Sequence, residues 1–228
     1  MKKDERKRKV VVVCAHPDDE ILGAAGAIQY HITCGDNVSI IHVTDGFYQD
    51  YDIDLMQMKR SHAKQAASLL GVEDVRFLGK HGLRLDTYPK FELNGLLTKI
   101  FEEIKPEIVY THHWGDVNND HQVVFDMAMV ACRPHRGTNV EQLLTFETLS
   151  STEWNGKLSN TAFIPNHFLT LNEKQVEQKI NSFACYTTKI FDHPHPRSKE
   201  GIRCLAEYRG QMISQPFAEA FYMVRSVI

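Results

Sequence analysis

The 228-residue sequence lacks the features of several common protein classes. No stretch approaches the ~20 consecutive apolar residues that a membrane helix requires, so no stable membrane insertion is expected. No secretory signal is expected either, because the early apolar run "VVVCAHPDD" turns acidic too soon. The five cysteines form no CxxC pair, which argues against a disulfide framework and an all-cysteine zinc site. We therefore expect a cytoplasmic protein in a reducing compartment.

Charge of one sign is not concentrated in the chain. The net charge is −3, and basic and acidic residues are interspersed, so no nucleic-acid partner is expected. The basic start "MKKDERKRK" also contains Asp4 and Glu5 and has no apolar face, and residues 1–8 are therefore predicted to form a flexible tail.

Glycine-rich and serine-based catalytic motifs are absent as well. The chain contains no GxGxxG, no GxxxxGK[ST] and no GxSxG. A nucleotide cradle and a serine hydrolase of these types therefore lack their key residues.

The pattern that is present alternates short apolar runs with amphipathic segments. Strands are predicted at 9–15, 37–43, 75–78 and 108–111, with helices at 20–34, up to Gly71, and at 91–104. This alternation predicts βαβ units, and hence an α/β fold with a mainly parallel sheet and helices on both faces. Further strands at 143–149 and 163–171 and helices at 173–186 and 199–208 complete a single domain over 1–228.

Polar side chains follow the first and the fourth of these strands. His16, Asp18 and Asp19 come after the first strand, and "THHWGDVNNDH" (111–121) comes after the fourth. Ligands of open parallel sheets bind beyond the carboxyl ends of the strands. We therefore expect the two groups to converge on one site.

The residue types at these strand ends fit a catalytic zinc centre. His16, Asp19 and His121 offer two imidazoles and a carboxylate, which leaves a fourth zinc position open for water. Asp18 remains as a carboxylate beside the metal and is the candidate general base. His121 begins a predicted helix whose dipole favours the neutral imidazole. Asp120 either caps that helix or orients a histidine.

Structural interpretations of both motifs stay open. "HPDD" on its own is compatible with a capped turn in which Asp18 or Asp19 is the N-cap, and "NNDH" with an ordinary helix start. Capping gives no reason for two histidines at two strand ends, so the combination favours a metal site. Glu20 is interpreted as an early helical residue at the positive end of the dipole.

"AHPDDE" (15–20) together with "DVNNDH" (116–121) resembles the PIG-L / LmbE family of zinc-dependent N-deacetylases. "MKRSHAKQAASLLGV" and "HPHPRS" also resemble segments of bacterial members. The resemblance implies a Rossmann-like fold and hydrolysis of the acetamido group of an N-acetylated amino sugar, giving acetate and a free amine.

The resemblance also assigns roles to residues. It implies that His16, Asp19 and His121 are the zinc ligands, that Asp18 is the general base and that Arg60 contacts substrate. Many members carry a histidine where this chain has Asn118, and an amide donates a hydrogen bond to an oxyanion but carries no positive charge. Either Asn118 suffices or another histidine takes the role, the candidates being His112, His113, His193 and His195. His195 and Arg197 are further candidates for substrate contact.

Two other functions remain compatible with the sequence. One is a metal-dependent hydrolase of another amide, such as a thiol conjugate or an antibiotic precursor. The other is a non-catalytic sugar- or metal-binding module, against which the intact Asp18 argues, because a pure binder has no use for a non-ligating carboxylate there. The sugar's aglycone is not given by the sequence, and a homo-oligomer stays open.

Overall fold

The computed structural model describes residues 6–46, 53–134, 139–156 and 160–227. Its strands form a seven-stranded sheet in the order β3-β2-β1-β4-β5-β7-β6. The parallel part comprises β1 (Lys9–Cys14), β2 (Asn37–Thr44), β3 (Asp74–Lys80), β4 (Ile108–His112) and β5 (Gln142–Phe146). The antiparallel strand β7 (Phe217–Ser226) lies between β5 and β6 (His167–Leu171).

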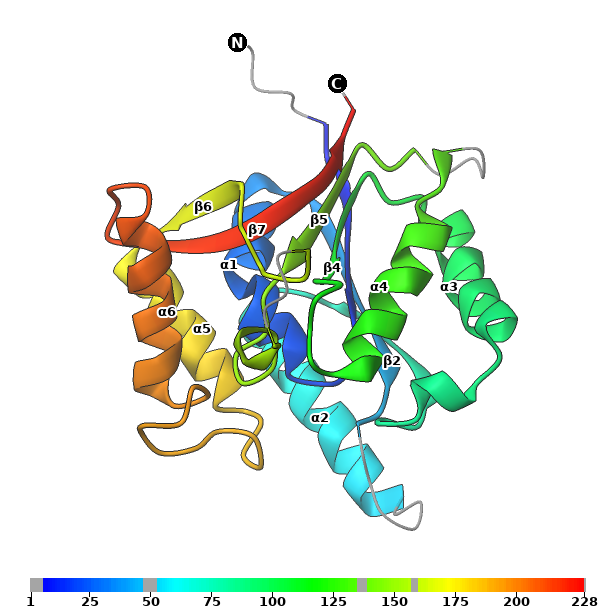
Figure 1. Cartoon of the computed structure of the whole chain (residues 1–228), viewed down its shortest axis with the longest axis horizontal. Helices are drawn as coiled ribbons and strands as arrows, with labels where there is room; N and C mark the ends of the chain where they lie inside the picture. The colour runs from blue at the N-terminus through cyan, green and yellow to red at the C-terminus, as the bar shows by residue number, and fades with distance from the viewer. Residues whose placement is uncertain (1–5, 47–52, 135–138, 157–159, 228) are drawn as a thin grey trace.

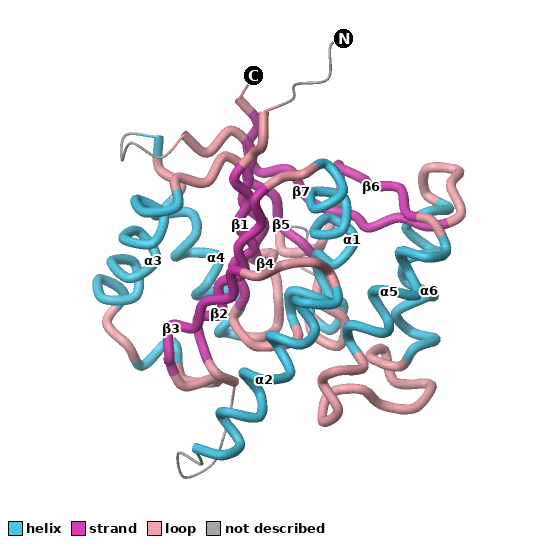
Figure 2. Tube along the Cα trace, turned by 180° about the vertical axis from the view of Figure 1, so that it is seen from behind, coloured by secondary structure: helices cyan, strands magenta, loops and turns pink. Residues whose placement is uncertain are grey.

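Helices cover both faces of this sheet, as the sequence predicts. Figure 1 shows α3 (Lys90–Ile104) and α4 (Asn119–Ala131) on one side, and α1 (Asp19–Cys34), α5 (Glu173–Phe183) and α6 (Lys199–Gln211) on the other. Seen from behind in Figure 2, α2 (Ile53–Leu69) lies on the side of α1. The α/β class with a mainly parallel sheet is therefore confirmed.

The central strand β1 explains the apolar run at the start of the chain. Val11 and Val13 pack toward α3 and α4, whereas Val10, Val12 and Cys14 pack toward α1. All five are at most 1% exposed. Burial on both faces makes a strand of a parallel sheet uniformly apolar instead of alternating.

The chain order of the central strands places the site. β1 pairs in parallel with β2 on one side and with β4 on the other. The connection from β1 leads to β2 and the connection from β4 leads to β5, in opposite directions along the sheet, which creates a crevice at the carboxyl ends of β1 and β4. Gly23 allows α1 to approach the sheet, since a Cβ there would lie 2.1 Å from the Phe146 ring.

The second half of the chain departs from the sequence prediction in its boundaries. β5 ends at Phe146, β6 begins at His167 and α5 ends at Phe183, so each element is shorter than predicted. The sequence prediction missed β7, which begins with small residues around the buried charge of Glu219 and therefore lacks a strand's regular apolar pattern.

Other expectations concern properties of the whole chain. No described helix is long and apolar enough to cross a membrane. The five cysteines are free in the structure. Residues 1–5 of the expected tail lie outside the described part, and the single-domain organisation and the cytoplasmic location stay predictions.

Candidate functional site

The turn from β1 into α1 carries the first group of site residues. Asp18 occupies the N-cap position of α1, but its side chain makes no capping hydrogen bond. Its φ of 121° lies in a region that non-glycine residues rarely adopt. The Asp19 Oδ2 accepts the His16 backbone N–H at 2.9 Å. Asp18 is therefore the N-cap residue by position, as one structural interpretation expected, but its side chain does not cap the helix, and the Asp19 side chain closes the turn.

Glu20 has a larger part in this turn than the sequence suggested. The side chain is fully buried, and its Oε2 accepts the Asp18 backbone N–H at 3.0 Å. The Tyr186 hydroxyl donates to its other oxygen. Burial raises the pKa of Glu20 to about 8. Glu20 therefore ties the backbone of Asp18 to a tyrosine that follows α5, in addition to starting a helix.

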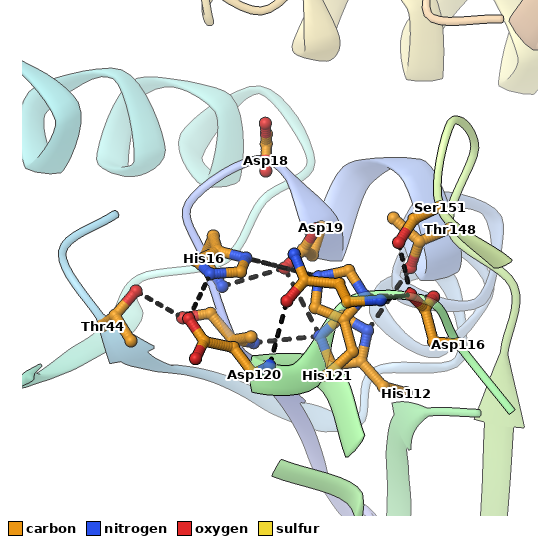
Figure 3. Close-up of polar contacts among 12 residues, drawn as sticks. His16, Asp18, Asp19, Thr44, His112, Asp116, Asp120, His121, Thr148 and Ser151 are labelled. Atoms are coloured by element: carbon orange, nitrogen blue, oxygen red, sulfur yellow. Dashed lines mark hydrogen bonds and ion pairs between the residues drawn. The ribbon is translucent and has the colours of Figure 1, made fainter. Parts of the chain in front are cut away.

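The start of α4 carries the second group. The Asn118 Oδ1 accepts the Asp120 backbone N–H at 2.9 Å, so Asn118 caps the helix. The Asp120 Oδ2 lies 2.8 Å from His16 Nε2, and its Oδ1 accepts the Leu85 N–H at 3.0 Å. Of the two roles expected for Asp120, the structure therefore shows histidine orientation and assigns capping to Asn118 (Figure 3).

His16, Asp19 and His121 converge with one donor atom each, as Figure 3 shows. The His16 Nδ1 lies 3.2 Å from Asp19 Oδ2, the His121 Nε2 lies 3.4 Å from the same oxygen, and the two nitrogens are 3.3 Å apart. Two ligands of a tetrahedral zinc ion, each ~2.0–2.1 Å from the metal, are separated by ~3.4 Å. The three atoms therefore form one face of such a tetrahedron.

A second carboxylate holds the other imidazole. The Asp116 Oδ2 lies 3.1 Å from His121 Nδ1, and the same side chain accepts hydrogen bonds from Ser151 and Thr152. Burial raises the pKa of Asp116, but His121 and the two hydroxyls outweigh it and lower the pKa to about 2. In both candidate histidine ligands, the ring nitrogen that points away from the cluster thus lies beside a carboxylate. This arrangement is typical of metal sites.

The protonation of His121 differs from the sequence expectation. Burial lowers its pKa, but Asp19 and Asp116 outweigh burial and raise the pKa to about 10. The two carboxylates therefore act against the effect expected of the helix dipole, which favours the neutral ring. A cation must displace this proton in order to bind.

The cluster fits a divalent cation for another reason. The Asp19 Oδ1 is buried and has no hydrogen-bond partner in the structure. An unpartnered buried carboxylate oxygen costs free energy unless a ligand satisfies it. The donor set, its spacing and this oxygen together identify His16, Asp19 and His121 as the residues that fit a metal ion.

A cavity of about 110 Å³ opens beside these residues. A single water needs only about 10–15 Å³, so the cavity has room for a larger polar group. Its described lining includes His16, Asp18, Asn118 and His121. Asp18 stands apart from the network of ligands in Figure 3, and its Oδ2 lies 3.0 Å from the Arg197 guanidinium.

The structure separates the two arginines predicted to contact substrate. Arg197 lines the cavity, bound to Asp18 and to the Leu149 carbonyl. Arg60 makes two hydrogen bonds to Asp45, at 2.7 and 2.9 Å, and is not among the described lining residues.

The other histidine candidates also lie outside the described cavity lining. His113 is buried and accepts the Gly115 N–H, and His195 accepts the Arg197 N–H. His112 stacks on the His121 ring with centroids 3.8 Å apart and accepts the Ala15 N–H. His193 is not among the lining residues either.

Sequence reasoning assigned no role to four ionisable residues of the described cavity lining. They are Lys59, His62, Tyr186 and Lys189. Lys59 and His62 lie within the segment "MKRSHAKQAASLLGV", whose resemblance to bacterial family members implied no role for either residue. Tyr186 and Lys189 follow α5, which approaches the cavity through tertiary packing.

Comparison with known proteins places these motifs in a family. The family model described as PIG-L, GlcNAc-PI de-N-acetylase, matches residues 11–132, more than half of the chain. A protein of Escherichia coli K12 named as the uncharacterized deacetylase YaiS is 25% identical over 183 residues, covering 77% of this chain and 88% of its own. Three further curated relatives are 26–27% identical, and the chain spans 43–56% of their length. Two are named as 1D-myo-inositol 2-acetamido-2-deoxy-alpha-D-glucopyranoside deacetylases and one as a probable N-acetyl-alpha-D-glucosaminyl L-malate deacetylase.

Two solved structures share the fold. The N,N'-diacetylchitobiose deacetylase of Pyrococcus horikoshii superposes with a TM-score of 0.75 at 20% identity, covering 95% of this chain and 84% of that one. The 4-carboxy-2-hydroxymuconate hydratase GalB of Pseudomonas putida reaches the same score at 18% identity, with 97% and 98% covered. The fold alone therefore does not define the reaction. The match to the family model does assign the family, and the chain belongs to the PIG-L family of GlcNAc-PI de-N-acetylases.

Proposed function

We propose that this protein is a zinc-dependent hydrolase that removes the acetyl group from an N-acetylglucosamine-type conjugate. The observation that carries the proposal is the triad of donor atoms at 3.2, 3.3 and 3.4 Å with a separate carboxylate, Asp18, on the adjoining cavity. Membership of the de-N-acetylase family supports the choice of an acetamido group. Amide hydrolysis needs an electrophile for the carbonyl and a base for water, and the site offers a place for each.

His16, Asp19 and His121 would hold the zinc ion. When bound, the ion supplies Lewis acidity for the amide carbonyl and lowers the pKa of a coordinated water to about 7. Asp120 and Asp116 orient the two imidazoles from behind, which keeps the donor nitrogens aimed at one point.

Asp18 is the general base in this proposal. Its side chain lies at the cavity wall, held by Arg197, and Glu20 holds its backbone. The carboxylate takes a proton from the attacking water. The same proton then goes to the departing amine, so that Asp18 begins and ends the cycle as a carboxylate.

Asn118 assists at the carbonyl oxygen. Its Oδ1 is engaged by the Asp120 N–H, which leaves the amide nitrogen as its hydrogen-bond donor toward the cavity that it lines. A donor so fixed stabilises the developing oxyanion without a positive charge. This assignment removes the need for another histidine, in keeping with the positions of His112, His113, His193 and His195 outside the lining.

The experiment that tests the proposal is acetate release by Asp18→Asn, with metal content measured on the same samples. We expect the variant to keep its zinc and to lose about 10²- to 10⁴-fold in kcat. Asp126→Asn removes an exposed carboxylate of α4 and serves as the matched control, with unchanged activity.

Two outcomes would contradict the proposal at different levels. Full activity of purified Asp18→Asn would remove Asp18 as the base. Zinc-loaded wild-type protein that releases no acetate from any N-acetylated sugar would instead favour the non-catalytic binding module, or the hydrolase of another amide if such a substrate turns over.

A further inference from the structure

Tyr186 is fixed in place where the chain leaves α5. It lies three residues beyond the end of that helix and is 2% exposed. Its backbone N–H donates to the Phe183 carbonyl at 3.0 Å, and its carbonyl accepts the Lys189 N–H at 2.8 Å. The Tyr186 ring also packs on the Phe183 ring, with centroids 6.2 Å apart. The backbone and the ring therefore give the hydroxyl group a defined position.

The Tyr186 hydroxyl begins a relay of two hydrogen bonds. It bonds to Glu20 Oε1, and Oε2 of the same carboxyl group accepts the Asp18 backbone N–H at 3.0 Å. Glu20 is fully buried, which shields both contacts from solvent. The relay holds in either protonation state of Glu20, because the tyrosine and the carboxyl group each carry an oxygen that can accept the proton between them.

The Asp18 backbone adopts a conformation that needs support from its surroundings. Its φ of 121° lies in the region that favours glycine. Its carbonyl accepts the N–H groups of Ile21 and Leu22, but its side chain makes no capping hydrogen bond. An ordinary N-cap residue has extended backbone angles and turns its side chain back onto the first N–H groups of the helix. The Asp18 carboxylate instead lies at the cavity wall, apart from the candidate metal ligands (Figure 3).

The same segment of chain also holds the Asp18 carboxylate. The Arg197 Nη1 donates to Asp18 Oδ2 at 3.0 Å, and the Arg197 Nε donates to the Leu149 carbonyl at 3.2 Å. Tyr186 and Arg197 both belong to the connection between α5 and α6. This connection therefore reaches the proposed base twice, at its main chain through Glu20 and at its carboxylate through Arg197.

We propose that Tyr186 is a positioning residue for the general base. Acting through Glu20, it keeps Asp18 out of the ordinary N-cap conformation and so keeps the carboxylate available to the cavity. The inference rests on the proposed function and adds to it a residue that does not touch the reacting atoms. Loss of the hydroxyl leaves the buried Glu20 with one hydrogen bond fewer, and the Asp18 backbone gains freedom to relax toward the capping geometry.

A double-mutant cycle tests this role in the zinc-loaded enzyme. Acetate release is measured for the wild type, Tyr186→Phe, Asp18→Asn and the double variant, with N-acetylglucosamine, its methyl glycoside and N,N'-diacetylchitobiose as probes. We expect Tyr186→Phe alone to lower kcat by about 10- to 100-fold and to change KM by less than about 2-fold, because a misplacement of about 1 Å costs up to ~10²-fold. In the Asp18→Asn background the same substitution should change kcat by less than about 2-fold, since no base remains to be positioned.

The cycle separates positioning from two other roles of the tyrosine. An equal loss of kcat in both backgrounds would indicate a general structural effect and would overturn the inference. A rise in KM with an unchanged kcat would place the hydroxyl on the substrate and would also overturn it. Tyr208→Phe removes the hydroxyl of an exposed tyrosine on α6 and is the matched control, with kcat unchanged.

Glu20 offers a conservative variant for the same relay. Glu20→Gln keeps an oxygen for the Asp18 N–H and an N–H group for the Tyr186 hydroxyl oxygen, whereas Glu20→Leu removes both. We expect the folded, zinc-loaded Glu20→Gln variant to have a kcat about 10-fold above that of Glu20→Leu or more. An equal kcat for the two would contradict a relay through Glu20.

Hydrogen exchange of the Asp18 amide keeps the inference distinct from the proposed function. We compare it by NMR with exchange of the Val12 amide in β1, which reports opening of the central sheet. The ratio of the Asp18 to the Val12 exchange rate should rise about 10-fold in Tyr186→Phe and stay unchanged in Tyr208→Phe. If no probe releases acetate, the hydrolase proposal fails and this ratio alone decides whether Tyr186 holds the Asp18 backbone. An unchanged ratio in Tyr186→Phe would overturn the inference.

Discussion

Two buried clusters of charge contact α1, one at its first residue and one further along the helix, and they satisfy their charges differently. In one, Lys179 of α5 donates to Glu219 of β7 at 2.7 Å and to the Leu22 carbonyl at 2.8 Å. Glu219 in turn accepts the backbone N–H groups of Gly26 and Ala27. Every charged atom in this cluster has a partner within the protein, so the cluster joins α1, α5 and β7.

The other cluster is incomplete by the same measure. The Asp19 Oδ1 has no hydrogen-bond partner among the described residues, and His16 and His121 turn two ring nitrogens toward each other at 3.3 Å. Burial and charge therefore do not by themselves identify a functional site. A functional site is identified by donor atoms that the protein aligns on one point and whose hydrogen-bonding capacity it leaves unused.

The largest expected effect comes from removing the shared carboxylate of the incomplete cluster. Asp19→Asn should lose tight metal binding, and acetate release should fall by about 10³-fold or more. Zinc should also stop stabilising the fold, whereas the wild type gains about 2.7 kcal/mol at a zinc concentration of 100 times the Kd. Urea unfolding with and without zinc measures this gain. A variant that retains the gain would show that Asp19 is not a ligand.

Breaking the satisfied cluster should act on stability instead. Lys179→Met leaves the Glu219 carboxylate buried without its cation, and the free energy of unfolding should fall by about 3–5 kcal/mol. The folded fraction should keep its metal content. Lys179→Met/Glu219→Gln removes both charges and should recover part of the loss in the same urea titration. A loss below about 1 kcal/mol in the single variant would refute the structural role.

A smaller effect is expected from removing the charge of the carboxylate that faces the candidate ligand His121. Asp116→Asn keeps the shape of the side chain but removes the charge facing His121, and the Kd for zinc should rise by about 10- to 100-fold. Competition with a chromophoric chelator measures the change, with Asp126→Asn as the control. An unchanged Kd would mean that Asp116 serves only its contacts with Ser151 and Thr152.

The smallest expected effect is a pH dependence of stability. Burial lowers the pKa of His113 to about 4. Below a pH of about 6.5 the unfolded chain binds a proton there that the folded protein does not, so stability is lost as the pH falls from about 6.5 to 4. His113→Gln should flatten this part of a urea-midpoint profile. A profile identical to that of the wild type would show that His113 does not contribute.

The parts of the fold that the sequence predicted are those whose signals are local. The apolar run of β1, the acidic turn after it and the Asn118 to His121 helix start are each readable within a few residues. Asp120, which orients His16, is held in turn by the backbone N–H of Leu85. Asp116, which orients His121, is held by the hydroxyl groups of Ser151 and Thr152. No periodicity encodes such contacts.

Two misjudged features have the same physical origin. β7 carries the buried Glu219, which contradicts a strand pattern until Lys179 is known to lie beside it. The negative charges of Asp19 and Asp116 raise the pKa of His121, against the neutral ring that the start of a helix favours. In both cases a tertiary partner reverses the expectation drawn from the local sequence.

The backbone of Asp18 has a consequence for engineering this protein. Its φ of 121° costs about 1–3 kcal/mol for a residue other than glycine. Asp18→Gly would remove that strain and so stabilise the fold. About 1 kcal/mol of this gain would be lost, because glycine has greater conformational freedom in the unfolded chain. A screen for heat resistance would thus tend to select a variant without its proposed base. Catalytic activity and thermal stability place opposite demands on this position, so mutant libraries should keep Asp18 unchanged.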